Sequence, residues 1–161
     1  MAKVKHINAL EREKMNFSTL GIRTSLRDFE LAYWLNLHYG LRFVCRPETL
    51  DTWEKDATWE YTVFDGSDIN GEALCLVMNL SCDATLKEEK GPSLFESTPE
   101  KHRLTSVKHW DYVLMAENAE FAFDLESALK RNPKITTAQY FEAHTQLTQS
   151  ETHLLYEIRN I

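Results

Sequence analysis

The stretch LRDFELAYWLNLHYG (residues 26–40) decides much of the fold. Gly40 supplies the positive φ with which many helices end, and Ser25 stands where an N-cap belongs. Asp28 follows Ser25 by three residues, as the acidic residue of a capping box does. The stretch therefore predicts a helix over these residues, and Ser25 is expected to be a polar anchor at its start.

Apolar side chains cover most of the surface of this helix. They comprise one stripe and a group that widens it: Leu26, Phe29, Tyr33 and Leu37, then Leu31, Ala32, Trp34 and Leu35. So wide an apolar surface is typical of a helix that is buried on more than one side. Because burial of one such side chain contributes about 1.5–3 kcal/mol, we expect the helix to organise the core.

Segments with the composition of β-strands lie on both sides of the helix. FSTLGIR (17–23) precedes it and LRFVCRPE (41–48) follows it, whereas LDTWEKDATW (50–59) is expected to be irregular or a turn. WEYTVFDG (59–66) and EALCLVMNLSC (72–82) come next, and the polar residues between them suit a β-hairpin. The second of these runs is almost continuously apolar, which is typical of a central strand.

The second half of the chain repeats the order strand, helix, strand. VKHWDYVLMAE (107–117) predicts another central strand, and NAEFAFDLESALKRNP (118–133) a short helix with Asp124 as a plausible N-cap. ITTAQYFEAH (135–144) has strand composition, and residues 152–158 fit either a terminal strand or a short helix.

Together these elements predict one α+β domain over residues 1–161. The expected architecture is a single, mostly antiparallel sheet with two helices packed on one face, and a ferredoxin-like arrangement is one option for part of it. Residues 83–105 are charged and contain Gly-Pro, so we expect them to form an irregular surface loop.

Composition excludes several classes of function. The 161 residues include 18 Lys and Arg against 25 Asp and Glu, a formal net charge of −7, which argues against gripping nucleic acid phosphates or an anionic membrane. No apolar run approaches the length that spans a bilayer, and the first residues lack the pattern of a signal peptide. The cysteines Cys45, Cys75 and Cys82 include no CxxC pair, so we expect a reduced, cytoplasmic protein.

Several segments follow the pattern of one known group of proteins. LGI (20–22) and SLRDFELAYWLN (25–36) match a strand and the helix after it, LVMNLS (76–81) a hairpin strand, and NPKITTAQYFE (132–142) a helix exit into a strand. These segments resemble the IPExxxVDY family, uncharacterised proteins found mainly in Bacteroidetes.

The motif that names the family aligns with LTSVKHWDY (104–112). Asp111 and Tyr112 match it, whereas Trp110 replaces Val and the residues Leu-Thr-Ser replace Ile-Pro-Glu. The resemblance implies a bacterial cytoplasmic protein, and the family has no established activity to carry over.

Asp111 has two interpretations. It lies within a predicted apolar strand, between Trp110 and Tyr112, where an unpaired carboxylate would be costly. The preferred interpretation is a structural anchor that accepts hydrogen bonds from a loop or helix N-terminus, such as that around Thr24 and Ser25. The alternative is a general acid or base with a raised pKa.

Other combinations of residues point less clearly to chemistry. Ser106, His109 and Asp111 have the residue types of a catalytic triad, but triads rarely assemble from neighbouring residues of one strand. The chain has no CxxC, HExxH or HxH spacing and neither GxGxxG nor a P-loop, so we expect no metal and no cofactor.

Four apolar residues are candidates for contact with another protein. Trp53 and Trp59 belong to an aromatic group around the predicted hairpin, and Leu94 and Phe95 lie on the predicted loop. Core packing is the alternative interpretation of the tryptophans.

We therefore expect a non-catalytic protein-interaction or self-associating module, whose partner is another protein or a second copy in a homodimer. The alternative is a small-molecule-binding regulatory domain. An enzyme that uses Asp111 and His109 is less favoured.

Overall fold

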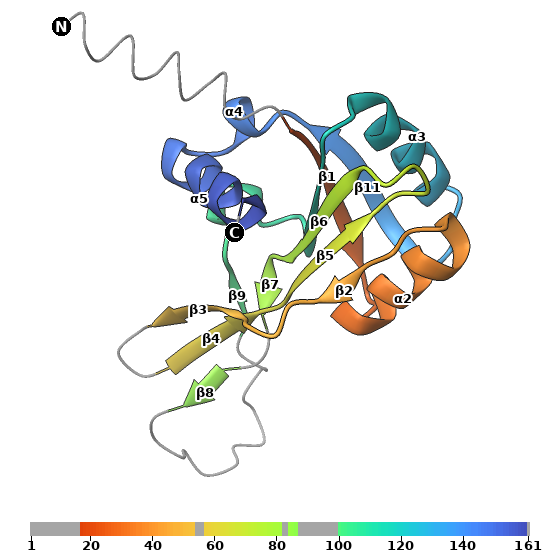
Figure 1. Ribbon diagram of the computed structural model, residues 1–161. Coiled ribbons are helices and arrows are strands. Elements are labelled where there is room, and N and C mark those ends of the chain that lie inside the picture. The colour runs from red at the N-terminus through yellow and green to blue at the C-terminus, as the bar shows by residue number, and fades with distance from the viewer. Residues whose placement is uncertain (1–16, 54–56, 82–83, 87–99, 161) are drawn as a thin grey trace, which may run out of the picture.

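A central sheet of six antiparallel strands organises the molecule (Figure 1). The computed structural model describes residues 17–53, 57–81, 84–86 and 100–160. In order across the sheet, the strands are β11 (Ile135–Phe141), β1 (Ser18–Thr24), β10 (Tyr112–Ala116), β6 (Ala73–Met78), β5 (Val63–Ser67) and β2 (Val44–Cys45). The edges of the sheet are therefore β11 and β2.

Two strand–helix–strand units interlock in this sheet. β10 lies between β1 and β6, and β1 lies between β10 and β11, so a strand of one unit divides the other. Their helices, α2 (Asp28–Tyr39) and α3 (Ala119–Leu129), pack on the same face of the sheet (Figure 1). The α+β fold is thus confirmed, and β11, β1, β10 and β6 are arranged as in a ferredoxin-like sheet.

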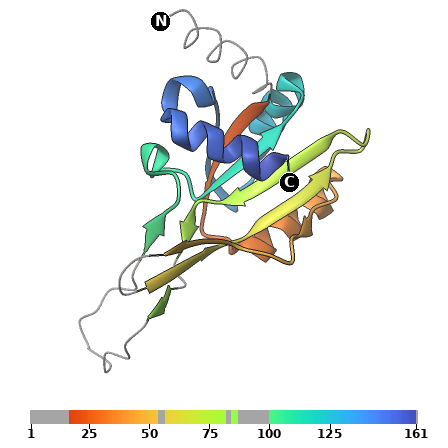
Figure 2. The same ribbon diagram turned by 60° about the vertical axis from the view of Figure 1, so that its left-hand side comes forward.

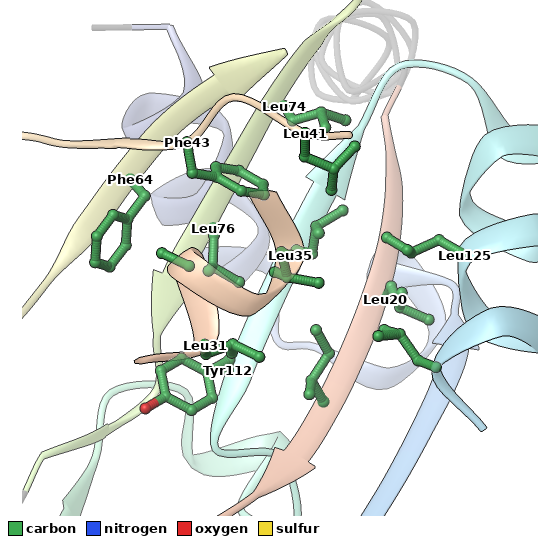
Figure 3. Packing of buried hydrophobic residues seen from close by; sticks show 14 of the residues in the cluster. Leu20, Leu31, Leu35, Leu41, Phe43, Phe64, Leu74, Leu76, Tyr112 and Leu125 are labelled. Atoms are coloured by element: carbon green, nitrogen blue, oxygen red, sulfur yellow. The ribbon is translucent and has the colours of Figure 1, made fainter. Parts of the chain in front are cut away.

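The core between the sheet and these two helices is aliphatic and aromatic. Leu31 and Leu35 of α2 belong to one buried cluster with Leu76 of β6, Leu20 of β1 and Leu125 of α3 (Figure 3). Each of these five side chains is at most 4% exposed. At about 1.5–3 kcal/mol for each buried side chain, this cluster is a main source of the stability of the fold.

A further helix covers the opposite face of the sheet. It is α5 (Gln149–Arg159), preceded by the short α4 (Ala143–Gln146). Figure 2 shows α5 lying across the sheet on the side away from α2. Leu155 and Ile158 of α5 pack with Val113 and Met115 of β10. Most of α5 is the segment for which the sequence fits either a strand or a helix.

The burial of α2 differs from the expectation for a helix with so wide an apolar surface. Its buried residues are those on the sheet side: Leu31, Ala32 and Leu35. The predicted core stripe is turned outward, with Phe29, Tyr33 and Leu37 exposed by 62%, 63% and 59%. The expectation that α2 is buried on more than one side is therefore wrong, because the sheet covers one side and no described element covers the stripe.

A smaller three-stranded sheet extends from the body of the molecule (Figure 1). Its strands are β3 (Leu50–Trp53), β4 (Ala57–Tyr61) and β8 (Ala84–Leu86), and nearby β7 (Leu80–Ser81) pairs with β9 (Lys101–His102). Residues 50–59 are thus strand rather than irregular where they are described. The expected loop 83–105 contains β8 and β9, and its residues 87–99 lie outside the described residues.

The expected strand over residues 59–66 is interrupted at Thr62. Its first part belongs to β4, which pairs with β3, and its second part is β5, which forms the hairpin with β6. The expected strand over 41–48 is also shorter, because only Val44 and Cys45 pair with β5.

Two boundaries in the second half also differ from prediction. The strand expected from residue 107 begins only at Tyr112, after a 3-10 turn at Thr105–Val107. The helix α3 begins with Asn118 as its N-cap, whose side chain accepts the backbone N–H groups of the next turn. Asp124 therefore lies inside the helix rather than capping it, since Asn is as effective a cap as Asp and comes first.

Candidate functional site

Asp111 and Tyr112 fix the connection from β1 to α2. The Oδ2 of Asp111 accepts the backbone N–H of Thr24 at 3.0 Å, and the Tyr112 hydroxyl donates to the carbonyl of Leu26 at 2.9 Å. The backbone N–H of Asp111 donates to the carbonyl of Ile22 at 3.0 Å. The structure thus places this carboxylate where α2 starts, with a hydrogen bond to backbone, and its charge also acts on His102.

Ser25 lies exposed in the same connection and does not cap α2. The helix begins at Asp28 with Arg27 in the N-cap position, and the Arg27 N–H donates to the Glu30 carboxylate at 2.8 Å. The predicted capping role of Ser25 is therefore wrong. The Asp28 carboxylate accepts the hydroxyl of Thr62 at 2.6 Å, which ties the start of the helix to the break between β4 and β5.

Asn79 is a buried anchor that sequence reasoning missed. Its Oδ1 accepts the N–H of Leu104 at 2.7 Å, and its Nδ2 donates to the carbonyls of Val107 and Trp110 at 3.2 and 2.8 Å. Both amide hydrogens and the oxygen are thereby satisfied, which a fully buried side chain requires. The available signal was a lone amide within the apolar run 72–82.

Ser106, His109 and Asp111 do not assemble as a triad. The backbone N–H of Ser106 donates to Glu151 of α5 at 3.1 Å. His109 is exposed, and its ring lies beside that of Trp110 with 4.6 Å between centroids. Since these residues precede β10, His109 and Asp111 do not share a strand face, and the arrangement provides no activated nucleophile.

The described cysteines and histidines are not arranged for chemistry. No group of three or more His, Cys, Asp or Glu side chains within the described residues could hold a metal ion. Burial raises the pKa of Cys75 to about 12, and burial followed by the charge of Asp28 raises the pKa of Cys45. Burial also lowers the pKa of His102, although Asp111 opposes this. These shifts favour neutral side chains over reactive ones.

Only one of the four residues expected to contact another protein has a described side chain. Trp59 is 7% exposed and packs beside Met78 in a small core of the three-stranded sheet. The core-packing interpretation therefore applies to Trp59, and this residue is not a surface contact. The side chain of Trp53, and Leu94 and Phe95, lie outside the described residues.

Among the described residues, three of the six exposed large apolar side chains lie on α2. Phe29, Tyr33 and Leu37 are four residues apart and therefore share one helix face. Ile69, 73% exposed, continues this line, because its Cγ2 lies 3.0 Å from the place that a Cβ on Gly40 would take. We name the set Phe29, Tyr33, Leu37 and Ile69 the α2 strip.

Side chains from the helices bind one backbone position at or beside each edge of the six-stranded sheet. Asn36 of α2 accepts the N–H of Phe43, just before β2, at 2.7 Å and donates to its carbonyl at 3.0 Å. Glu126 of α3 accepts the N–H of Tyr140 on β11. Burial raises the pKa of Glu126, but hydrogen bonds from Lys130 and Tyr140 outweigh it and lower that pKa overall. A partner strand would have to displace these side chains to pair at Phe43 or Tyr140.

A cavity of about 690 Å³ opens beside the start of α2. Its lining combines apolar and polar side chains, including Met78, Leu80, Tyr112, Ser25, Arg27 and Asp111. Its size and mixed lining are those of sites that hold small molecules.

Comparison with known proteins gives no relative for this arrangement. No protein-family model, no curated protein and no solved structure matches the chain. The resemblance to the IPExxxVDY family therefore stays a prediction. Within the described residues, no helix has the length and apolar character needed to cross a membrane.

Proposed function

We propose that the protein is a non-catalytic module that acts by self-association through the α2 strip. The observation that supports this is the exposure of Phe29, Tyr33 and Leu37, each by about 60%, on a helix whose other side is in the core. A contiguous apolar surface of this kind on a folded protein commonly marks a contact with another molecule. Asn36 at Phe43 and Glu126 at Tyr140 oppose strand pairing at those two positions, which favours this helix face as the contact.

The size of the strip sets the expected strength of association. In two copies, Phe29, Tyr33 and Leu37 amount to six large side chains, not counting Ile69. Complete burial of one contributes about 1.5–3 kcal/mol, so their partial exposure leaves roughly 5–11 kcal/mol in total. Association costs about 4–15 kcal/mol in lost freedom of motion. We therefore expect a reversible dimer with a Kd in the roughly micromolar range or weaker.

We also propose that the resemblance to the IPExxxVDY family reflects a shared, bacterial and cytoplasmic protein type. Support comes from the contacts among the matching segments. Asp111 and Tyr112 of the naming motif bind the connection that starts α2, and Asn79 of the hairpin strand binds the residues before Asp111. Segments that match the family are thus the ones that hold each other in place.

Native mass spectrometry over a range of protein concentrations tests the self-association. The expected result is a dimer without added mass, whose fraction rises with concentration. Tyr33→Lys should give only monomer, because the charge would be buried in the contact. Val44→Lys is the matched control, since Val44 is 71% exposed but lies outside the strip, and it should still dimerise. A wild-type protein that stays monomeric at all concentrations would contradict the proposal.

The cavity beside α2 favours a second candidate, a small-molecule-binding regulatory domain. In the same spectra this function predicts a reproducible extra mass on each protomer. Ser25→Trp, which places a large side chain at the lining of the cavity, should abolish that mass, whereas Tyr33→Lys should keep it. Absence of added mass in the wild-type protein would favour the self-association proposal.

A further inference from the structure

We infer that the partner at the α2 strip is a second copy of the chain whose α2 runs antiparallel, with Tyr33 at the two-fold axis. This inference rests on the proposed self-association. Its starting point is the spacing of the strip, in which Phe29 precedes Tyr33 by four residues and Leu37 follows it by four. The three side chains have nearly equal exposure, so neither end of the strip dominates.

The strip continues beyond these three residues at the carboxyl-terminal end of the helix. Gly40 ends α2 and follows Tyr33 by seven residues. Gly40 has no side chain, but the Cγ2 of Ile69 lies 3.0 Å from the place of its missing Cβ, so an apolar group stands there as well. At about 100° per residue, Phe29 and Leu37 lie about 40° to either side of Tyr33 around the helix axis.

Reversing the direction of the helix maps this pattern onto itself. In an antiparallel pair centred on Tyr33, Phe29 of each copy meets Leu37 of the other, and Tyr33 meets its equivalent. Every apolar position is then opposite an apolar position, as the self-complementary surface of a two-fold dimer requires.

Charge along the helix favours the antiparallel direction over the parallel one. The first turn of α2 carries Asp28 and Glu30, next to the N-cap Arg27. An antiparallel pair keeps the acidic first turns of the two helices apart and also sets the two helix dipoles in opposite directions. A parallel pair would bring the two acidic ends together.

A two-fold contact of this kind uses the strip of both copies completely. Assembly therefore ends at two chains, and the sheets lie on the outside of the dimer with their edges unchanged.

Paired charges distinguish the antiparallel register from the alternatives. Phe29→Lys and Leu37→Glu, each introduced singly, place a charge against an apolar side chain and should weaken association about tenfold or more. The double variant Phe29→Lys/Leu37→Glu places Lys opposite Glu twice in the antiparallel pair, so it should associate about tenfold more tightly than either single variant. In a parallel pair the same double variant would place like charges opposite each other.

Phe29→Glu/Leu37→Glu is the matched control, because it places Glu opposite Glu in either direction and should be monomeric. Sedimentation equilibrium measures the dissociation constants. Thermal unfolding followed by circular dichroism should show that all variants remain folded, since both positions are exposed by about 60%.

The outcomes separate the two proposals. If the wild-type protein dimerises and Tyr33→Lys does not, but the Lys/Glu double variant is no tighter than the single variants, the antiparallel register is overturned and self-association through the strip stands. A wild-type protein that is monomeric throughout overturns both. Species larger than a dimer overturn the two-fold arrangement.

Discussion

A single methyl group at Gly21 has no room in this fold. A Cβ on Gly21 would lie 2.3 Å from the ring of Trp110, which is itself buried. Because real atoms cannot approach so closely, Gly21→Ala should lower the free energy of unfolding by about 3 kcal/mol through overpacking. Urea unfolding at pH 7 measures the loss.

The neighbour of Gly21 supplies the control for this prediction. Trp110→Leu removes the ring, so in that background Gly21→Ala should cost about 1 kcal/mol or less. A cost equal to that in the wild-type background would mean that the ring of Trp110 does not lie over Gly21.

Asp111 allows a second test at the scale of one residue. Asp111→Ala leaves the N–H of Thr24 without its acceptor and should destabilise the protein by about 1–3 kcal/mol. Ser25→Ala, in the same connection but exposed, should change the free energy of unfolding by less than about 0.5 kcal/mol. Chemical denaturation measures the free energy of unfolding of both variants, and equal losses would argue against the anchoring role of Asp111.

At the scale of elements, Glu151 joins α5 to the turn before β10. Burial raises the pKa of Glu151, but hydrogen bonds from Ser106 and Thr148 outweigh it and lower the pKa from 4.5 to about 2. The folded protein therefore holds the ionised form more tightly than the unfolded chain does. The stabilisation is present above about pH 4.5 and is lost as the pH falls toward about 2.

Glu151→Gln should consequently lower the free energy of unfolding at pH 7 by about 1–2 kcal/mol, as loss of a capping residue does. Between pH 4.5 and 2 it should also flatten the pH dependence of stability, which denaturation at a series of pH values measures. Glu60→Gln, at an exposed position of β4, is the control and should leave that dependence nearly unchanged. A Glu151→Gln variant with the wild-type slope would show that Glu151 is not the titrating group.

The limits of sequence reasoning are also clearest at this scale. Local signals located α2 well, since Gly40 ends it as expected. They could not say which face is buried, because both sides of the helix are apolar and only the position of the sheet decides. For α5 the signal was present but unused: Thr148 and Glu151 form a capping box, with the N–H of each accepted by the side chain of the other.

For the candidate site, too, the sequence predicted some contacts but not others. Composition indicated that the carboxylate of Asp111 needs a hydrogen-bond partner, and the structure places that partner at Thr24. The contacts of Asn36 with Phe43 and of Glu126 with Tyr140 join a helix to a strand edge. They depend on how helices sit over the sheet, which no local pattern determines.

At the scale of the whole molecule, net charge opposes pairing. Each copy carries a formal charge of −7, so two copies repel each other over distances that salt screens. Raising NaCl from about 20 to about 300 mM should therefore tighten the dimer by about threefold or more. Sedimentation equilibrium at several salt concentrations measures this, and weaker association in high salt would mean that ion pairs rather than the α2 strip dominate the contact.

The side chains of Asn36 at Phe43 and Glu126 at Tyr140 bear on how copies of the protein can assemble. An open strand edge regenerates itself each time a molecule adds to it, so growth has no natural end and leads to fibres. By contrast, an apolar patch on a helix face is no longer available for contact once a partner molecule covers it. Asn36 and Glu126 oppose strand pairing at these two positions, while the exposed α2 strip lies on a helix face, where a contact of limited size does not propagate.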